Sequence, residues 1–142
     1  MSEGSKRRLK MWIRLLGVTR SAENGLREYL RVKHETTLPR FDVMAALFRR
    51  REGVTMSELS RMLLVSNGNA TAVVDRLEGE GLVRRTPSEV DRRTVHVALT
   101  PEGTAAFEAM AEGHEAEVAR LFAGLTEEEL DQMTAILKGM GK

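Results

Sequence analysis

The chain has 142 residues, of which 42% are hydrophobic and 30% charged, and its formal net charge is +1; these values are typical of one globular domain. It contains no cysteine, which excludes disulfide bonds, thiolate zinc sites and thiol-based redox sensing. No apolar stretch approaches the roughly 20 residues needed to cross a bilayer, and Arg14 interrupts the apolar stretch after the basic N-terminus. We therefore expect a cytoplasmic protein without a signal peptide or membrane contact.

Charge is distributed unevenly along the chain. Residues 1–60 contain 13 Lys or Arg against 7 Asp or Glu, residues 61–100 contain 6 against 5, and residues 101–142 contain 3 against 9. Opposite charges favour association of the two ends of the chain, although exposed ion pairs contribute only about 0 to 1 kcal/mol each. The nearly neutral middle indicates a protein that uses a few placed arginines rather than a broad basic surface.

Apolar residues recur at helical spacing in the first third of the chain. A run that begins near Leu9 predicts a long helix ending near His34. Leu38, Pro39 and Arg40 predict the start of a second helix with proline in its first turn, and this helix is expected to stop at residues 49–53.

Two shorter helices are expected next. Thr55 and Glu58 have the spacing of a capping box at the start of the first. Ser66 is expected to cap the second, and Gly81 to end it in the left-handed conformation. Its buried side is expected to consist of Ala70, Val73, Val74 and Leu77. This order is that of a helix-turn-helix, although ordinary helical hairpins share it.

The opposite face of this second helix is small and polar. Asn67, Asn69 and Thr71 would allow a close approach to base edges in a major groove of DNA. Arg76, one turn further on, is expected to contact a phosphate. The face therefore predicts a recognition helix.

A two-stranded ribbon is expected to follow. Residues 82–83 begin the first strand, and the alternation of TVHVAL at 94–99 predicts the second. Between them, TPSEVDRR (86–93) is expected to project as a loop. In this loop Asp91 is expected to hold Arg93 extended for a minor groove. A solvated hairpin tip is the alternative, but the position after a recognition helix favours a DNA-binding wing.

Two helices are expected to complete the chain. One begins at Thr100 and Pro101 and runs to about residue 122. Thr126 and Glu129 form a second capping box at the start of the last helix. With the first helix, these segments carry more apolar surface than one small domain needs, which predicts pairing with a second subunit.

These separated motifs resemble those of MarR-family transcriptional regulators over nearly the whole chain. The resemblance rests on the helix pair at 55–85, on DRR at 91–93 and on LTPEG at 99–103. It implies a mainly helical winged helix-turn-helix with a small β-wing, built from four helices, two strands and two further helices. The single domain would divide into dimerisation helices (1–36 and 101–142) and a DNA-binding lobe (37–100).

The resemblance further implies an obligate homodimer that binds a pseudo-palindromic operator in double-stranded DNA, acts as a repressor, and is released by a small ligand. No cofactor and no enzymatic activity are expected. The residues expected to contact DNA are Ser66, Asn67, Asn69, Thr71, Arg76, Arg84, Asp91, Arg92 and Arg93.

A narrower resemblance, to MarR regulators of aromatic-acid catabolism, rests on TLPRFDVM at 37–44, NGNAT at 67–71 and the region of His114. Some of those regulators respond to hydroxycinnamoyl-CoA thioesters. It implies an effector that is an aromatic acid or its CoA thioester, held by Trp12, Arg40, Phe41, Met44, Met110 and His114. The alternative for these residues is ordinary core and surface packing, since methionines and aromatics at helical spacing usually pack.

Other chemistry has little support. The three histidines are scattered, and a zinc site at His114 with Glu112 and Glu115 is a weak alternative to solvated helix charges. No phosphate-binding glycine loop and no nucleophile with a placed base is present. The competing functional classes are a winged helix that binds protein instead of DNA, and a MarR-type regulator with a different effector or none.

Overall fold

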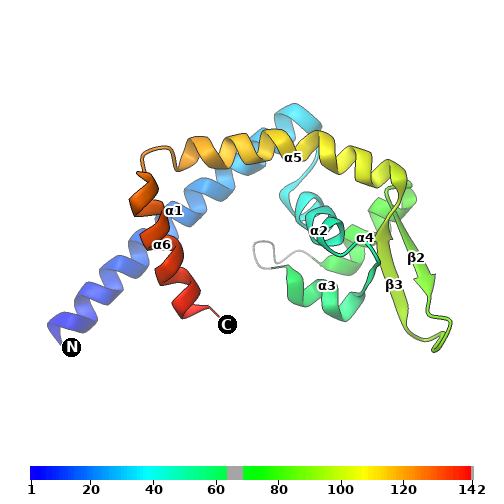
Figure 1. Ribbon diagram of the computed structural model, residues 1–142, viewed down its shortest axis with the longest axis horizontal. Helices are drawn as coiled ribbons and strands as arrows, with labels where there is room; N and C mark the ends of the chain where they lie inside the picture. The colour runs from blue at the N-terminus through cyan, green and yellow to red at the C-terminus, as the bar shows by residue number, and fades with distance from the viewer. Residues whose placement is uncertain (64–68, 142) are drawn as a thin grey trace.

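The computed structural model describes residues 1–63 and 69–141 of the chain. The described residues form the expected order of helices and strands (Figure 1), with one additional short strand. The elements are α1 (Glu3–His34), α2 (Leu38–Arg49), β1 (Val54–Thr55), α3 (Met56–Met62), α4 (Ala70–Gly79), β2 (Val83–Pro87), β3 (Val95–Leu99), α5 (Pro101–Leu121) and α6 (Glu127–Met140). Mainly helical architecture with a β-wing is thereby confirmed.

Helix α5 lies across the top of the molecule, and α1 runs obliquely from the lower left up to it and packs against it (Figure 1). Helices α2, α3 and α4 and the wing lie below one end of α5. Glu35 closes α1 in the left-handed conformation, with φ of 50°. The Tyr29 hydroxyl donates to the carbonyl of Met110 at 3.2 Å. A Cβ at Gly113 would overlap that hydroxyl, so the glycine permits the close approach of α5 to α1.

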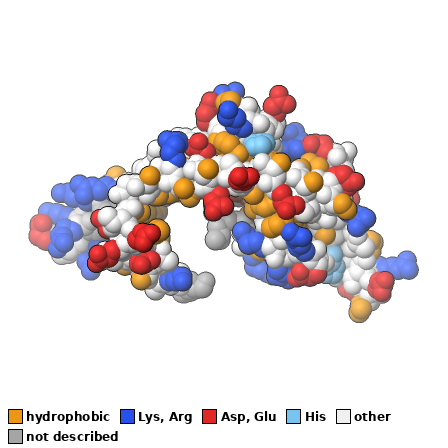
Figure 2. Space-filling model, turned by 45° about the horizontal axis from the view of Figure 1, so that its top comes forward, with side chains coloured by type: hydrophobic (Ala, Val, Ile, Leu, Met, Phe, Trp, Pro, Cys, Tyr) orange, Lys and Arg blue, Asp and Glu red, His pale blue; other side chains and the backbone are white. Residues whose placement is uncertain are grey.

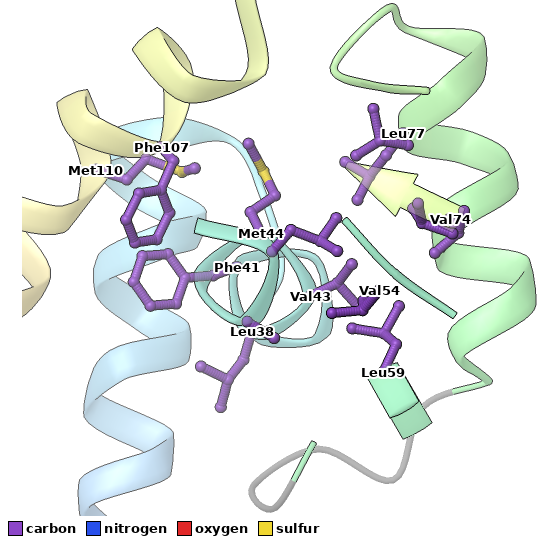
Figure 3. Close-up of a cluster of buried hydrophobic side chains, with 14 of the residues drawn as sticks. Leu38, Phe41, Val43, Met44, Val54, Leu59, Val74, Leu77, Phe107 and Met110 are labelled. Atoms are coloured by element: carbon purple, nitrogen blue, oxygen red, sulfur yellow. The ribbon is translucent and has the colours of Figure 1, made fainter. Parts of the chain in front are cut away.

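Helix α2 lies at the centre of the hydrophobic core. Thr37 caps it by accepting from the Arg40 N–H at 3.3 Å, and Pro39 lies in its first turn, as expected. Figure 3 shows side chains from α2 meeting side chains from α3, α4 and α5. The buried apolar residues are Leu30, Leu38, Phe41, Val43, Met44, Ala46, Leu47, Val54, Leu59, Val74, Leu77, Val83, Val97, Phe107 and Met110.

The predicted capping box of α3 is confirmed. The Thr55 hydroxyl accepts from the Glu58 N–H at 3.1 Å, and the Glu58 carboxylate accepts from the Thr55 N–H at 3.0 Å. The predicted cap of α4 at Ser66 is wrong, because α4 begins at Ala70 and its N-cap is Asn69. Ser66 itself lies outside the described residues.

The wing is a three-stranded antiparallel sheet in the order β1-β3-β2. Strand β1, which sequence patterning did not reveal, pairs Val54 with Val97. Strand β2 pairs Val83 with Leu99. Gly81 has φ of +77° and turns the chain from α4 into β2, as expected. The inner face of the ribbon completes the core.

Helix α6 contributes nothing to that core, since all of its residues are exposed. Its capping box is nevertheless formed as predicted, with the Glu129 N–H donating to the Thr126 hydroxyl at 3.1 Å. Most residues in the N-terminal half of α1 are also exposed. Exposed apolar side chains on these two segments and the end of α5 are Leu9, Met11, Trp12, Ile13, Val18, Phe122, Leu130, Met133, Ile136, Leu137 and Met140.

Among the described residues, no helix has the length and apolar character required to span a membrane.

Candidate nucleic-acid interface

The outward face of α4 carries only small side chains in its first turn. Thr71 and Ala72 are exposed in its first turn, and Arg76 is exposed one turn later. Val74 and Leu77, on the opposite side, are fully buried. The amide oxygen of Asn69 accepts from the N–H groups of Thr71 at 3.1 Å and Ala72 at 3.3 Å. These bonds leave the side-chain NH₂ of Asn69 free of the helix cap.

Arg85 joins α4 to the wing. It lies on β2, and only 25% of its side chain is exposed. Its guanidinium contacts Asp75 Oδ1 at 2.6 Å and donates to Glu78 Oε1 at 2.8 Å. Its backbone N–H donates to Glu78 Oε2 at 3.2 Å. The pKa of Arg85 is raised, first by the hydrogen bond to Asp75. Ion pairs and a backbone hydrogen bond therefore link α4 to β2 of the wing.

Arg40 joins the other end of α4 to α2. Its two terminal nitrogens donate to Glu80 at 2.9 and 2.7 Å, a bidentate arrangement, and its Nε donates to the Thr36 hydroxyl at 3.0 Å. The pKa of Glu80 is lowered, chiefly by the hydrogen bond from Arg40. The Arg40 guanidinium, which was expected to help hold the effector, is thus already paired with a carboxylate.

The wing turn is ordered by Asp91. Its carboxylate accepts from the Arg93 N–H at 3.0 Å and from the Thr94 hydroxyl at 3.3 Å. The Ser88 hydroxyl accepts from the Val90 and Asp91 N–H groups at 3.2 and 3.4 Å. By contrast, the Arg93 guanidinium lies 3.9 Å from Asp91 and is 97% exposed. Asp91 shapes the turn more strongly than it holds the Arg93 side chain.

The remaining residues expected to contact DNA lie at the wing tip, on the outer face of the ribbon, or outside the described residues. Ser66 and Asn67 lie outside the described residues. Arg92 and Arg93 are exposed at the tip of the wing, which projects beyond the helices and ends in basic side chains at the right of Figure 2. Arg84 is exposed on the outer face of the ribbon, beside a shallow polar groove that also includes Arg51 and His96.

The six residues expected to hold a ligand do not form one site. Phe41, Met44 and Met110 are buried core residues (Figure 3), which is the alternative that their spacing left open. Trp12 is 50% exposed on α1 and does not belong to that core. Sequence spacing could not reveal this, because it does not show how far along α1 the contacts with the core extend.

His114 packs against the core instead of facing open solvent. Its ring stacks on Phe41 with centroids 4.2 Å apart and an interplanar angle of 17°. Burial lowers the pKa of His114. Among the described residues, no three His, Asp or Glu side chains are grouped closely enough to hold a metal ion, and Glu112 and Glu115 do not form such a group with His114.

A groove of about 360 Å³ lies where α1, α2 and α5 meet the end of α4. Its lining includes Arg40, Met44 and Met110, three of the residues expected to hold a ligand, together with His34 and Glu80. The Tyr29 hydroxyl lies 2.9 Å from Nε2 of His34 at this edge. The groove therefore lies between the long helices α1 and α5 and the end of α4.

Comparison with known proteins identifies the family. The sequence profile of the MarR family matches residues 36–95, the region from α2 to the first residue of β3. The chain belongs to the MarR family. This family consists of transcriptional regulators, which confirms the expectation that the chain is not an enzyme.

Relatives of this MarR-family chain extend the match. The regulator PecS of Dickeya dadantii is 34% identical over 107 residues, which cover 74% of this chain and 64% of PecS. The match thus spans less than two thirds of that relative. The regulator MhqR of Bacillus subtilis is 28% identical over 96% of this chain and 93% of its own length. Neither is named as a regulator of aromatic-acid catabolism.

Among solved structures, a cysteine-to-serine mutant of Escherichia coli MarR complexed with operator DNA is 27% identical to this chain. It covers 99% of this chain and 100% of its own, with a TM-score of 0.82. The similarity includes the terminal helices as well as the winged helix, which confirms the MarR-like fold.

Proposed function

We propose that this MarR-family protein is a DNA-binding transcriptional repressor that binds a pseudo-palindromic operator as a homodimer. The observation that carries the proposal is that a small exposed first turn on α4 lies in the same lobe as a projecting arginine-tipped wing, which α4 contacts through β2. A helix with small side chains can approach base edges in a major groove. Arginines at a wing tip suit the negative potential of the adjacent minor groove.

Residues 1–36 and 101–142 are proposed as the dimerisation part, and residues 37–100 as the DNA-binding lobe. Support comes from the apolar surface that one chain leaves open, including a groove of about 440 Å³ between α5 and α6, lined by Phe122, Leu130, Met133 and Leu137. Burying such a side chain contributes roughly 1.5 to 3 kcal/mol. In Figure 2, the basic side chains of α1 gather at the left end of the molecule, near acidic side chains.

The proposed contacts divide by role. Asn69 and Thr71 would lie at base edges, Arg76 and Arg84 at phosphates, and Arg92 and Arg93 in the minor groove. Asp91 would keep the wing turn in shape. Ser66 and Asn67, expected at the start of the recognition helix, belong to the same proposal.

Selection of duplexes from a randomised library by the purified protein tests this function. We expect inverted half-sites about 10 base pairs apart, centre to centre. Affinity for the selected duplex should fall linearly with salt on logarithmic axes, because phosphate contacts release counterions. Failure to enrich any sequence, with only salt-insensitive binding, would instead favour the winged helix as a protein-interaction module.

We also propose that a small ligand in the groove beside Arg40 and Met110 lowers operator affinity. An aromatic carboxylate suits the groove's apolar wall and single guanidinium, for which it would compete with Glu80. Of a CoA thioester, only the acyl group would fit about 360 Å³. A 100-fold loss of DNA affinity requires about 2.7 kcal/mol of coupling.

Calorimetric titration with aromatic acids and their CoA thioesters, with and without the selected duplex, tests the effector class. Reciprocity requires DNA to weaken ligand binding by the same factor. Binding that DNA leaves unchanged, or no binding at all, would eliminate this class and leave a regulator with another effector or none.

A further inference from the structure

The proposed recognition helix, α4, has an acidic net charge by itself. Between Ala70 and its C-cap at residue 80, α4 carries three carboxylates, Asp75, Glu78 and Glu80, against one guanidinium, Arg76. Its local net charge is therefore −2. Because a DNA duplex carries one negative charge per roughly 1.7 Å of axis, an acidic helix in its groove is repelled.

Each of these carboxylates forms an ion pair with an arginine from another element. Arg85 bridges Asp75 at 2.6 Å and Glu78 at 2.8 Å. Arg40 binds both oxygens of Glu80 at 2.9 and 2.7 Å. The two arginines come from β2 and α2, and together they bring the local charge of α4 to zero.

The two arginines are placed to compensate charge instead of meeting DNA. Side-chain exposure is only 25% for Arg85 and 18% for Arg40, against 60% for Asp75 and 51% for Glu80. The carboxylates thus lie closer to solvent than the guanidiniums that neutralise them. Pairs of this kind, partly withdrawn from water, are screened less by salt than fully exposed charges.

We propose that Arg85 sets operator affinity without touching DNA, by neutralising the carboxylates of Asp75 and Glu78 beside the phosphate backbone. The proposal rests on the proposed DNA-binding function. Arg85 then acts on DNA indirectly, by cancelling the charge of two other side chains. The proposal predicts that DNA binding no longer requires these ion pairs once both carboxylates are removed.

The test compares three proteins on the duplex selected by the wild type. Arg85→Met leaves two uncompensated carboxylates and should weaken binding at least 10-fold, more strongly at low salt. The triple variant Arg85→Met/Asp75→Asn/Glu78→Gln removes all three charges. The summed charge at these three positions changes from −1 in the wild type to zero, so DNA affinity should return to at least the wild-type value. Arg50→Met, which removes another guanidinium that bridges two carboxylates, Glu52 and Glu58, is the matched control. It should change affinity less than 3-fold.

Thermal unfolding of each variant identifies misfolded protein. Comparison of Arg85→Met with the triple variant separates an electrostatic effect on DNA binding from a structural one. The triple variant lacks the same ion pairs as Arg85→Met, so a purely structural role would leave both equally weak. Wild-type affinity in Arg85→Met, or no recovery in a folded triple variant, would overturn the proposal. If the wild type binds no duplex, the proposed function itself fails, which is a distinguishable result.

Discussion

The lobe formed by α2, α3, α4 and the wing differs sharply from the arms formed by α6 and the N-terminal half of α1. In the lobe, Leu59, Val74 and Leu77 are completely buried. On α6, Leu137 is 51% exposed and Ile136 is 63% exposed. Both regions contain amphipathic helices, yet only the lobe covers its own apolar face.

The two regions are alike in local structure. Helix α3 begins with the Thr55–Glu58 capping box, and α6 begins with the equivalent box of Thr126 and Glu129. What differs is the partner available to the apolar side. The lobe thus has a core of its own, whereas the arms leave their apolar side chains exposed, and we propose that a second copy of the chain covers them.

Equal substitutions in the two regions should separate these sources of stability. Leu77→Ala, in the lobe, removes a fully buried side chain and should lower the free energy of unfolding by about 2 to 5 kcal/mol. Leu137→Ala should lower the melting temperature by an amount that depends on protein concentration. Calorimetric unfolding at several concentrations measures both. Equal, concentration-independent losses would contradict the comparison.

A charge in the exposed arm should break the dimer. Ile136→Glu would bury an unpaired carboxylate in the proposed interface and should weaken dimerisation 100-fold or more, about 2.7 kcal/mol. Gln132→Glu, which adds the same charge on α6, is the control. Sedimentation equilibrium gives the dissociation constants. An unchanged dimer in Ile136→Glu would place the interface elsewhere.

The wing tests the lobe's surface without disturbing its core. Arg93→Ala should weaken operator binding by about 1 to 3 kcal/mol while the melting temperature stays constant, because this side chain is 97% exposed. Asp91→Ala should weaken binding less, through loss of the turn's hydrogen bonds. Gel-shift titrations over a salt series measure both. If Arg93→Ala bound as tightly as the wild type, the wing assignment would be refuted.

The junction between arm and lobe contains a carboxyl whose pKa is raised to about 6. Burial between α1 and α2 is the main cause of the shift in Asp42, and Glu23 adds to it, while Arg49 and Arg27 oppose it. One buried Asp42 oxygen has no hydrogen-bond partner among the described residues. Because the folded state favours the neutral acid, stability falls as the pH rises from the ordinary pKa of 3.8 to about 6, and the full cost of the carboxylate is present above about pH 6.

Asp42→Asn should therefore stabilise the fold by about 1 kcal/mol near neutral pH, a value reduced for partial exposure to solvent. The gain should vanish toward pH 4, where both folded and unfolded wild type bind the proton. Urea unfolding across this pH range gives the comparison, with Asp131→Asn on exposed α6 as the control. A gain that is independent of pH would exclude titration of Asp42 as its cause.

Much of the fold could be predicted from the sequence, since its signals act within a few residues. The capping boxes, the proline in the first turn of α2 and the glycine after α4 all act locally, and all are confirmed. The wing loop was predicted for the same reason. Strand β1 was not, because two residues carry no periodicity and Val54 joins the sheet only by pairing with Val97.

The partners of charged and apolar side chains were decided by the tertiary structure. Arg40 was expected from the sequence to help hold a ligand, but packing of α2 against α4 pairs it with Glu80, 40 residues away. Trp12 has the same helical spacing as the core residues, but the helix carries it beyond the lobe. Local sequence determines whether a helix forms and which face is apolar. What covers that face, and which charges remain free, depends on segments distant in the chain, whose contacts exist only after folding.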